Sequence, residues 1–128
     1  MNQLMNQLYV AVDFVSDMRN EAGLWYDVKI GSSKNAVKRI DGMKTSRPNV
    51  CLLWNHPATR AEEGRLHHAI KFGCDSWLLH HVKEWYWMHE DAFTITDDGQ
   101  PTLMPEIKLA FISLLGLITS GEMPRERV

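Results

Sequence analysis

Apolar residues gather in three short runs in the first half of the chain. Leu8 to Val15, residues 24–30 and residues 50–54 are rich in β-branched and aromatic side chains, and each run has the length of a strand. The polar residues 16–23, which include a glycine, separate the first two runs. The pattern predicts three buried strands, with a loop or a wide hairpin joining the first pair.

Helix signals follow the second and third runs. Cap-type residues precede a short helix that is expected over residues 36–43. The Asn-His-Pro sequence at 55–57 is expected to open a second helix that continues to Gly73, because proline is favoured in the first turn and glycine after the last. A further short helix is expected over about 75–82, and residues 84–87 are interpreted as the end of a helix or as a short strand.

The last third of the chain predicts a hairpin and a helix. Residues 92–96 and 100–103 flank an Asp-Asp-Gly turn, and a helix is expected to begin at Pro105, with a loose tail over 121–128. Its apolar positions exceed what a free surface helix shows, so the helix is expected to pack on the domain's own sheet or in a homodimer interface. These positions are Ile107, Phe111, Leu114, Leu115 and Ile118.

Composition places the chain among globular proteins. It has 128 residues, 45% of them hydrophobic and 23% charged, which is typical of a single globular domain, and the order of its strand and helix signals predicts the α/β class of mixed α+β type. No apolar run reaches the roughly 18 residues that span a bilayer, and the start lacks a signal-peptide pattern. We therefore expect a cytoplasmic protein without a membrane partner, in the host cytoplasm if it is phage-encoded.

The net charge of −2 is distributed unevenly. The segment from residue 29 to residue 47 holds six basic residues and one acid, whereas the rest holds eight basic residues and fifteen acids. A local positive face on an acidic body can direct a phosphate backbone to one surface, although a solvated helix face has the same pattern. The six are Lys29, Lys34, Lys38, Arg39, Lys44 and Arg47.

The order of these signals is more informative than any one of them. A strand with Tyr9 is followed by a strand that ends in Lys29-Ile30-Gly31, a basic helix, a helix with Glu-x-x-Leu-His, and Glu84-Trp85-Tyr86. Over about residues 8–87 this succession resembles the GIY-YIG nuclease superfamily. It is most similar to the compact phage and bacterial branch, whose second signature reads KIG and which has a Glu-x-x-Leu-His and Glu-Trp-Phe pair.

The resemblance implies a fold and a domain organisation. It implies a small three-stranded sheet flanked by helices as a nuclease domain over residues 1–90. The hairpin, helix and tail of residues 91–128 are then a C-terminal extension packed on the same domain.

The resemblance also implies a metal-dependent DNA endonuclease with named site residues. Tyr9 takes the place of the tyrosine of the first signature, and Arg39 that of the arginine on the first helix. Glu63 matches the metal-binding glutamate, for Mg²⁺ or Mn²⁺, and His67 lies four residues later on the same helix face. Tyr9, Lys29, Arg39 and His67 are the implied catalytic residues.

These residue types suit the hydrolysis of a phosphodiester. One carboxylate can hold Mg²⁺ while waters and phosphate complete its octahedral shell. The guanidinium of Arg39 can fork onto two phosphate oxygens, and Tyr9 can orient or activate water with the charge of Lys29 nearby. The residues expected to contact backbone phosphates are Lys34, Lys38, Lys44 and Arg47.

The sequence also departs from the superfamily pattern. Lys29 stands where the second signature usually has a tyrosine, the first signature lacks its glycine, and no asparagine stands at the matching point near the end of the module. The long connection between the two signatures makes Tyr26 an alternative to Tyr9.

Two other interpretations stay open. The first is a catalytically silent DNA-binding or protein-inhibiting accessory module. Whether the chain is an endonuclease or such a module, a protein partner could supply specificity, and Trp85 and Tyr86 either fill the core or stack on bases. The second is a structural zinc site, although the sequence has no Cys-x-x-Cys. Its candidate ligands are Cys51, His56, His67, His68, Cys74, His80 and His81.

Overall fold

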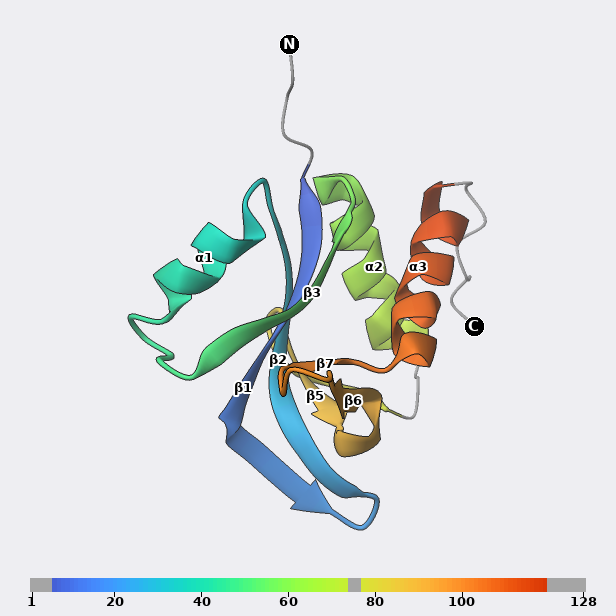
Figure 1. Cartoon of the computed structure of the whole chain (residues 1–128). Coiled ribbons are helices and arrows are strands. Elements are labelled where there is room, and N and C mark those ends of the chain that lie inside the picture. The colour runs from blue at the N-terminus through green and yellow to red at the C-terminus, as the bar shows by residue number, and fades with distance from the viewer. Residues whose placement is uncertain (1–5, 74–76, 120–128) are drawn as a thin grey trace.

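A computed structural model describes residues 6–73 and 77–119 of the chain (Figure 1). The expected mixed α+β class is confirmed: the described part forms a five-stranded antiparallel sheet in the order β3-β1-β2-β5-β4, a two-stranded hairpin and three helices. The expectation of three strands is wrong, because two further strands extend the sheet beyond β2.

A long hairpin forms the centre of the sheet. Strand β1 (Gln7–Asn20) pairs with β2 (Gly23–Ser33), and an irregularity between Asp13 and Asp17 shifts their register. The polar stretch 16–23 therefore belongs mostly to paired strands, as the hairpin interpretation predicted. Its reversal uses Gly23, whose φ of +132° is accessible mainly to glycine.

The helix expected over 75–82 is wrong. Within it, β4 (Leu78–Val82) is an edge strand that pairs with β5 (Trp85–His89), so the strand interpretation of residues 84–87 is confirmed. Lys83 makes the reversal with a φ of +54°. A lysine in this conformation gives no turn signal of the kind that glycine or asparagine gives, which is why the sequence pattern missed the hairpin.

The second helix begins later than expected. Strand β3 (Val50–Pro57) pairs with β1 as far as Pro57, and α2 (Arg60–Gly73) begins after Thr59. The Thr59 hydroxyl accepts from the amide of Glu62 at 3.1 Å, and the Glu62 carboxylate accepts from the amide of Thr59 at 2.8 Å. This capping box is the actual start signal.

The remaining elements follow the expected pattern closely. Helix α1 (Ala36–Met43) is capped by Asn35, a short 3₁₀ turn (Glu90–Ala92) follows β5, and β6 (Phe93–Ile95) pairs with β7 (Pro101–Leu103). Helix α3 (Pro105–Thr119) is the last element. Among the described residues, no helix combines the length and the hydropathy needed to cross a membrane.

Each face of the sheet packs on a different set of helices. Helices α2 and α3 lie side by side on one face, and α1 covers part of the other (Figure 1). On α3, Phe111 and Leu115 are buried in the same cluster as the sheet residues Val10 and Ile30. Part of the apolar stripe of α3 is therefore covered within the chain, while Leu109 remains exposed. The expected homodimer stays a prediction, and the tail over 121–128 lies outside the described residues.

A buried ionic network joins the α1–β3 connection to the face of the sheet that α1 partly covers. Arg47 Nη1 lies 3.0 Å from Oδ2 of the fully buried Asp27 and 3.4 Å from Oδ2 of Asp13. Its guanidinium stacks over the ring of Trp85, with Cζ 3.7 Å from the ring centroid, and His81 Nδ1 lies 3.2 Å from Asp27 Oδ1. Arg47, expected to contact a nucleic acid, thus has its charge compensated within the fold.

We expect Arg47→Gln to lower the free energy of unfolding by about 3 kcal/mol, because the buried carboxylate of Asp27 loses its cation. Urea denaturation measures this. The matched control is Lys44→Gln, since Lys44 makes an exposed ion pair with Asp41 at 3.6 Å that contributes about 0–1 kcal/mol. Equal losses in the two variants would contradict the assigned role of Arg47.

Candidate active site

The candidate site forms where β2 continues beyond its pairing with β5. The two strands pair only from Trp25 to Lys29 of β2, and the amide of Ile30 then donates to the carbonyl of Glu84 at 3.1 Å. Beyond this point β2 lies beside α2, which contributes Glu63 and His67. Residues far apart in sequence therefore meet at one end of the sheet.

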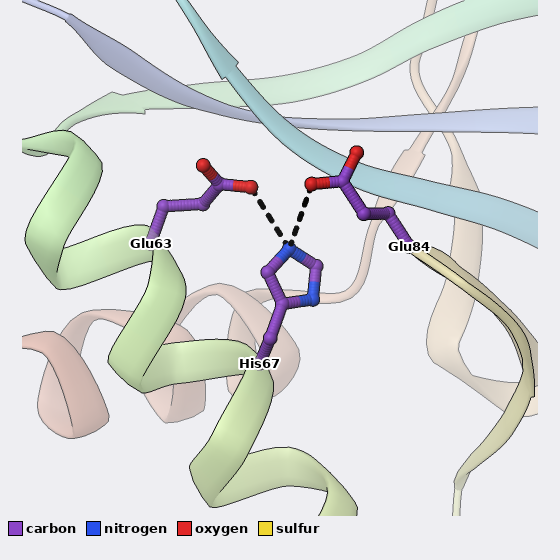
Figure 2. Close-up of side chains that lie close together, drawn as sticks. All are labelled: Glu63, His67 and Glu84. Carbon is purple, nitrogen blue, oxygen red and sulfur yellow. Dashed lines mark hydrogen bonds and ion pairs between the residues drawn. The ribbon is translucent and has the colours of Figure 1, made fainter.

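Two carboxylates and an imidazole converge there (Figure 2). His67 Nε2 lies 2.9 Å from Glu63 Oε2 and 3.8 Å from Glu84 Oε2, and one potential ligand atom from each residue lies within 4.8 Å of the others. The side chains of Glu63 and His67 are each 11% exposed, whereas that of Glu84 is 46% exposed. Lys29 Nζ pairs with Glu84 Oε1 at 3.1 Å. The cluster is thus buried on one side and open on the other.

Glu63 is held as a carboxylate. Burial alone would raise the pKa of its carboxyl group, but hydrogen bonds from His67 and from the Ser32 hydroxyl, which donates to Oε1 at 2.9 Å, outweigh burial and hold that pKa below its ordinary value. Glu63 is therefore ionised and oriented at neutral pH.

The neighbours of His67 define which ring nitrogen carries the proton. Nε2 faces two carboxylates, which only accept hydrogen bonds, so the neutral ring is protonated at Nε2. Nδ1 then accepts from the buried hydroxyl of Tyr86 at 2.6 Å. Burial, followed by the charges of Glu84 and Glu63, strongly raises the pKa of Tyr86, which keeps that donor proton in place.

Tyr9 lies beside this cluster, on the face of the sheet that α1 partly covers. It is directly opposite Gly31 in the β1–β2 register, and its ring lies on that glycine: a Cβ there would be 2.6 Å from the Tyr9 hydroxyl. Burial raises the pKa of Tyr9, and hydrogen bonding with Arg39 and the charge of Arg39 partly offset the rise. Tyr9 thus keeps its proton at neutral pH, and with only 1% of its surface exposed it lies against Gly31 and Arg39.

Five expected site residues lie close together, whereas the basic residues expected to contact phosphates fall into two groups. Glu63, His67, Lys29, Tyr9 and Arg39 lie around the end of β2. Of the basic residues expected on phosphates, Lys34 and Lys38 line surface hollows next to Arg39. Lys44 and Arg47 are outside those linings and pair with carboxylates of the chain.

The sequence interpretation missed three residues. Glu84 was assigned to a motif, yet its carboxylate joins the cluster, and Ser32 and Arg60 were given no site role. Each has a sequence signal in hindsight: Glu84 is beside the turn before a strand, Ser32 follows the second signature, and Arg60 begins α2. None of these signals reveals proximity, which only the fold supplies.

The donor set fits an oxygen-seeking divalent cation. Two carboxylates, one of them half-exposed, are the ligands that Mg²⁺ and Mn²⁺ prefer. His67, protonated at Nε2 when neutral, would hydrogen-bond the carboxylates beside such an ion. Within the described residues this is the one convergent group of three potential metal-ligating side chains. The zinc candidates Cys51, His56, His68, His80 and His81 form no second group there, and Cys74 lies outside that part of the chain.

The alternative tyrosine lies elsewhere. Tyr26 packs edge-to-face on Phe14 and Phe93, with ring centroids 4.9 and 5.6 Å away, on the side of the sheet that α2 and α3 cover.

Comparisons with family models, curated proteins and solved structures found no match for the chain. The family assignment therefore stays a prediction.

We expect Gly31→Ala to lower the free energy of unfolding by about 1–3 kcal/mol, because the new methyl group displaces the Tyr9 ring. Gly64→Ala on α2 is the matched control. No atom outside its own helix turn and chain neighbours lies within 4 Å of its Cβ position, so alanine should stabilise the helix by about 0.5–1 kcal/mol. Thermal and urea unfolding measure both signs, and a stabilising Gly31→Ala would contradict the packing of Tyr9 on Gly31.

Tyr86→Phe removes the hydroxyl that donates to His67 Nδ1 and leaves a buried nitrogen without that partner. We expect a loss of about 1–2 kcal/mol in unfolding free energy and a change in the side-chain ¹⁵N shifts of His67, as the tautomer balance alters. Tyr26→Phe, in a different aromatic cluster, should leave those shifts unchanged. Unchanged His67 shifts in Tyr86→Phe would refute the assigned hydrogen bond.

Proposed function

We propose that the chain is a metal-dependent DNA endonuclease that hydrolyses phosphodiester bonds at a GIY-YIG-like site. One observation carries the proposal: the Glu63, His67 and Glu84 cluster lies at the same end of the sheet as Lys29 and Arg39. An acidic cluster able to hold a cation, beside cations able to hold a phosphate, is what this reaction requires.

Each residue has a role that follows from its surroundings. Glu63, ionised and oriented by Ser32, and the half-exposed Glu84 would hold Mg²⁺ or Mn²⁺. When bound, such an ion supplies positive charge that stabilises the negative charge developing on the phosphoryl oxygens. Arg39 would add a bidentate donor for those oxygens, and the buried Tyr9, which hydrogen-bonds with Arg39, would position it.

His67 and Lys29 act on the carboxylates. His67 donates from Nε2 toward Glu63 and Glu84, and its other nitrogen is fixed by Tyr86, so the imidazole keeps the two acids in position. Lys29, paired with Glu84, reduces the repulsion between the two carboxylates. Loss of either residue should weaken cleavage, because the carboxylates of Glu63 and Glu84 would be less well positioned.

The test uses a pair of adjacent glutamates on α2. Glu63→Gln keeps the side-chain shape and removes the charge, so cleavage of supercoiled plasmid with Mg²⁺ or Mn²⁺ should fall on the order of 100-fold or more. Binding to the same DNA in EDTA should persist. Glu62→Gln is the control, because glutamine also completes the capping box.

Three outcomes separate the candidates. Cleavage by wild type and by Glu62→Gln, but not by Glu63→Gln or in EDTA, supports the enzyme. Equal cleavage by wild type and Glu63→Gln assigns the activity to a contaminant or to another site. Salt-sensitive DNA binding without cleavage under any divalent metal favours the non-catalytic accessory module.

A further inference from the structure

Two surface hollows adjoin beside the acidic cluster. The first, of about 510 Å³, is lined by Asn6, Ser32, Ser33, Lys34, Arg39 and Arg60. The second, of about 380 Å³, is lined by Ser33, Lys34, Asn35, Lys38, Arg39 and Gly42. Ser33, Lys34 and Arg39 line both hollows, so the two adjoin, and together they are called the depression.

The depression lies where three elements begin. Asn6 precedes β1, Lys34 and Asn35 precede α1, and Arg60 is the first residue of α2. In Figure 1 the first turns of α1 and α2 lie on either side of the start of β1. Arg60 and Lys38 therefore approach the depression from different helices.

The chemistry of the lining selects an anion. The two hollows together present four cations, Lys34, Lys38, Arg39 and Arg60, and their remaining polar lining residues are serines and asparagines. Neither lining contains a carboxylate, although the chain as a whole has an excess of acids. Ser32, which lines the first hollow, donates to Glu63 at 2.9 Å, so that hollow opens next to the metal-binding candidates.

Helix stability does not explain Arg60. A cation at the first position of a helix faces the positive end of the helix dipole, which disfavours it. The acids of the same turn, Glu62 and Glu63, are the residues that suit that end. The charge of Arg60 therefore does not serve the helix dipole, and its side chain lines the first hollow.

We propose that the two hollows bind two successive phosphates of one nucleic-acid strand, with Arg60 contacting the phosphate nearer the acidic cluster and Lys38 contacting its neighbour. The identity of the ligand as a nucleic acid rests on the proposed function. One phosphodiester carries a single negative charge, whereas the depression gathers four cations, and a strand supplies the repeated charge that matches them. Arg39 and Lys34, shared by both hollows, lie between the two phosphates.

The experiment measures how binding of a fluorescein-labelled 12-nucleotide oligothymidylate depends on salt, in EDTA so that cleavage plays no part. Each lost phosphate contact should reduce the slope of log K against log salt by about 0.7 for a single strand. We expect about that loss for Arg60→Gln, the same for Lys38→Gln, and about twice as much for the double variant. Arg65→Gln is the matched control, since Arg65 is exposed on α2 and outside both linings.

Three results would overturn the proposal. One is an equal slope change in Arg60→Gln and Arg65→Gln, which would mean that only net charge matters. Another is a double variant no different from the single ones, which would mean one shared phosphate. The third is saturable displacement of the oligonucleotide by millimolar inorganic phosphate at fixed ionic strength, which would assign the depression to a free anion. Circular dichroism checks that each variant keeps its fold.

The outcome separates this inference from the proposed function. Additive slope changes without plasmid cleavage by the wild type, with Mg²⁺ or Mn²⁺, would retain the two-phosphate site and remove the endonuclease. Metal-dependent cleavage with no slope change in Arg60→Gln would retain the endonuclease and remove this site.

Discussion

The site depends on the mismatch in length between β2 and β5. Because β5 pairs with β2 only up to Lys29, residues 30–33 of β2 are left beside α2, and Ser32 there reaches Glu63. The turn before β5 delivers Glu84 to the same point. A β5 that followed β2 to its end would fill the space in which the cluster forms.

The two ionic networks on this sheet differ in their exposure to solvent, and this difference decides whether a network can bind a ligand. Asp27 is fully buried and lies against Arg47 and His81, so its negative charge is compensated within the protein. The second network, at Glu63, is closed on one side by His67 but ends in Glu84, whose side chain is 46% exposed. A closed network stabilises, because breaking it leaves a buried charge. An open network has unused lone pairs that face solvent, so it can accept a ligand.

Sequence reasoning succeeded where the signal is local. The apolar runs of β1, β2 and β3 and the Asn35 cap of α1 are visible as patterns, and the elements lie there. It failed at β4, whose reversal uses Lys83, and at the start of α2, where Pro57 is tolerated on an edge strand. For the site, residue order suggested which side chains to consider, but the convergence of Glu84 with Glu63 comes from strand pairing, which no local pattern encodes.

The departure at Lys29 accounts for the composition of the cluster. Two carboxylates within reach of one imidazole repel each other, and in the absence of a cation one of them would tend to take up a proton. Lys29 Nζ, 3.1 Å from Glu84 Oε1, supplies that cation from β2, at the position where the resembled superfamily usually has a tyrosine. A phenol of ordinary pKa is neutral at pH 7 and could not balance the second acid. The lysine and the second carboxylate therefore belong together as one ion pair at the edge of the cluster.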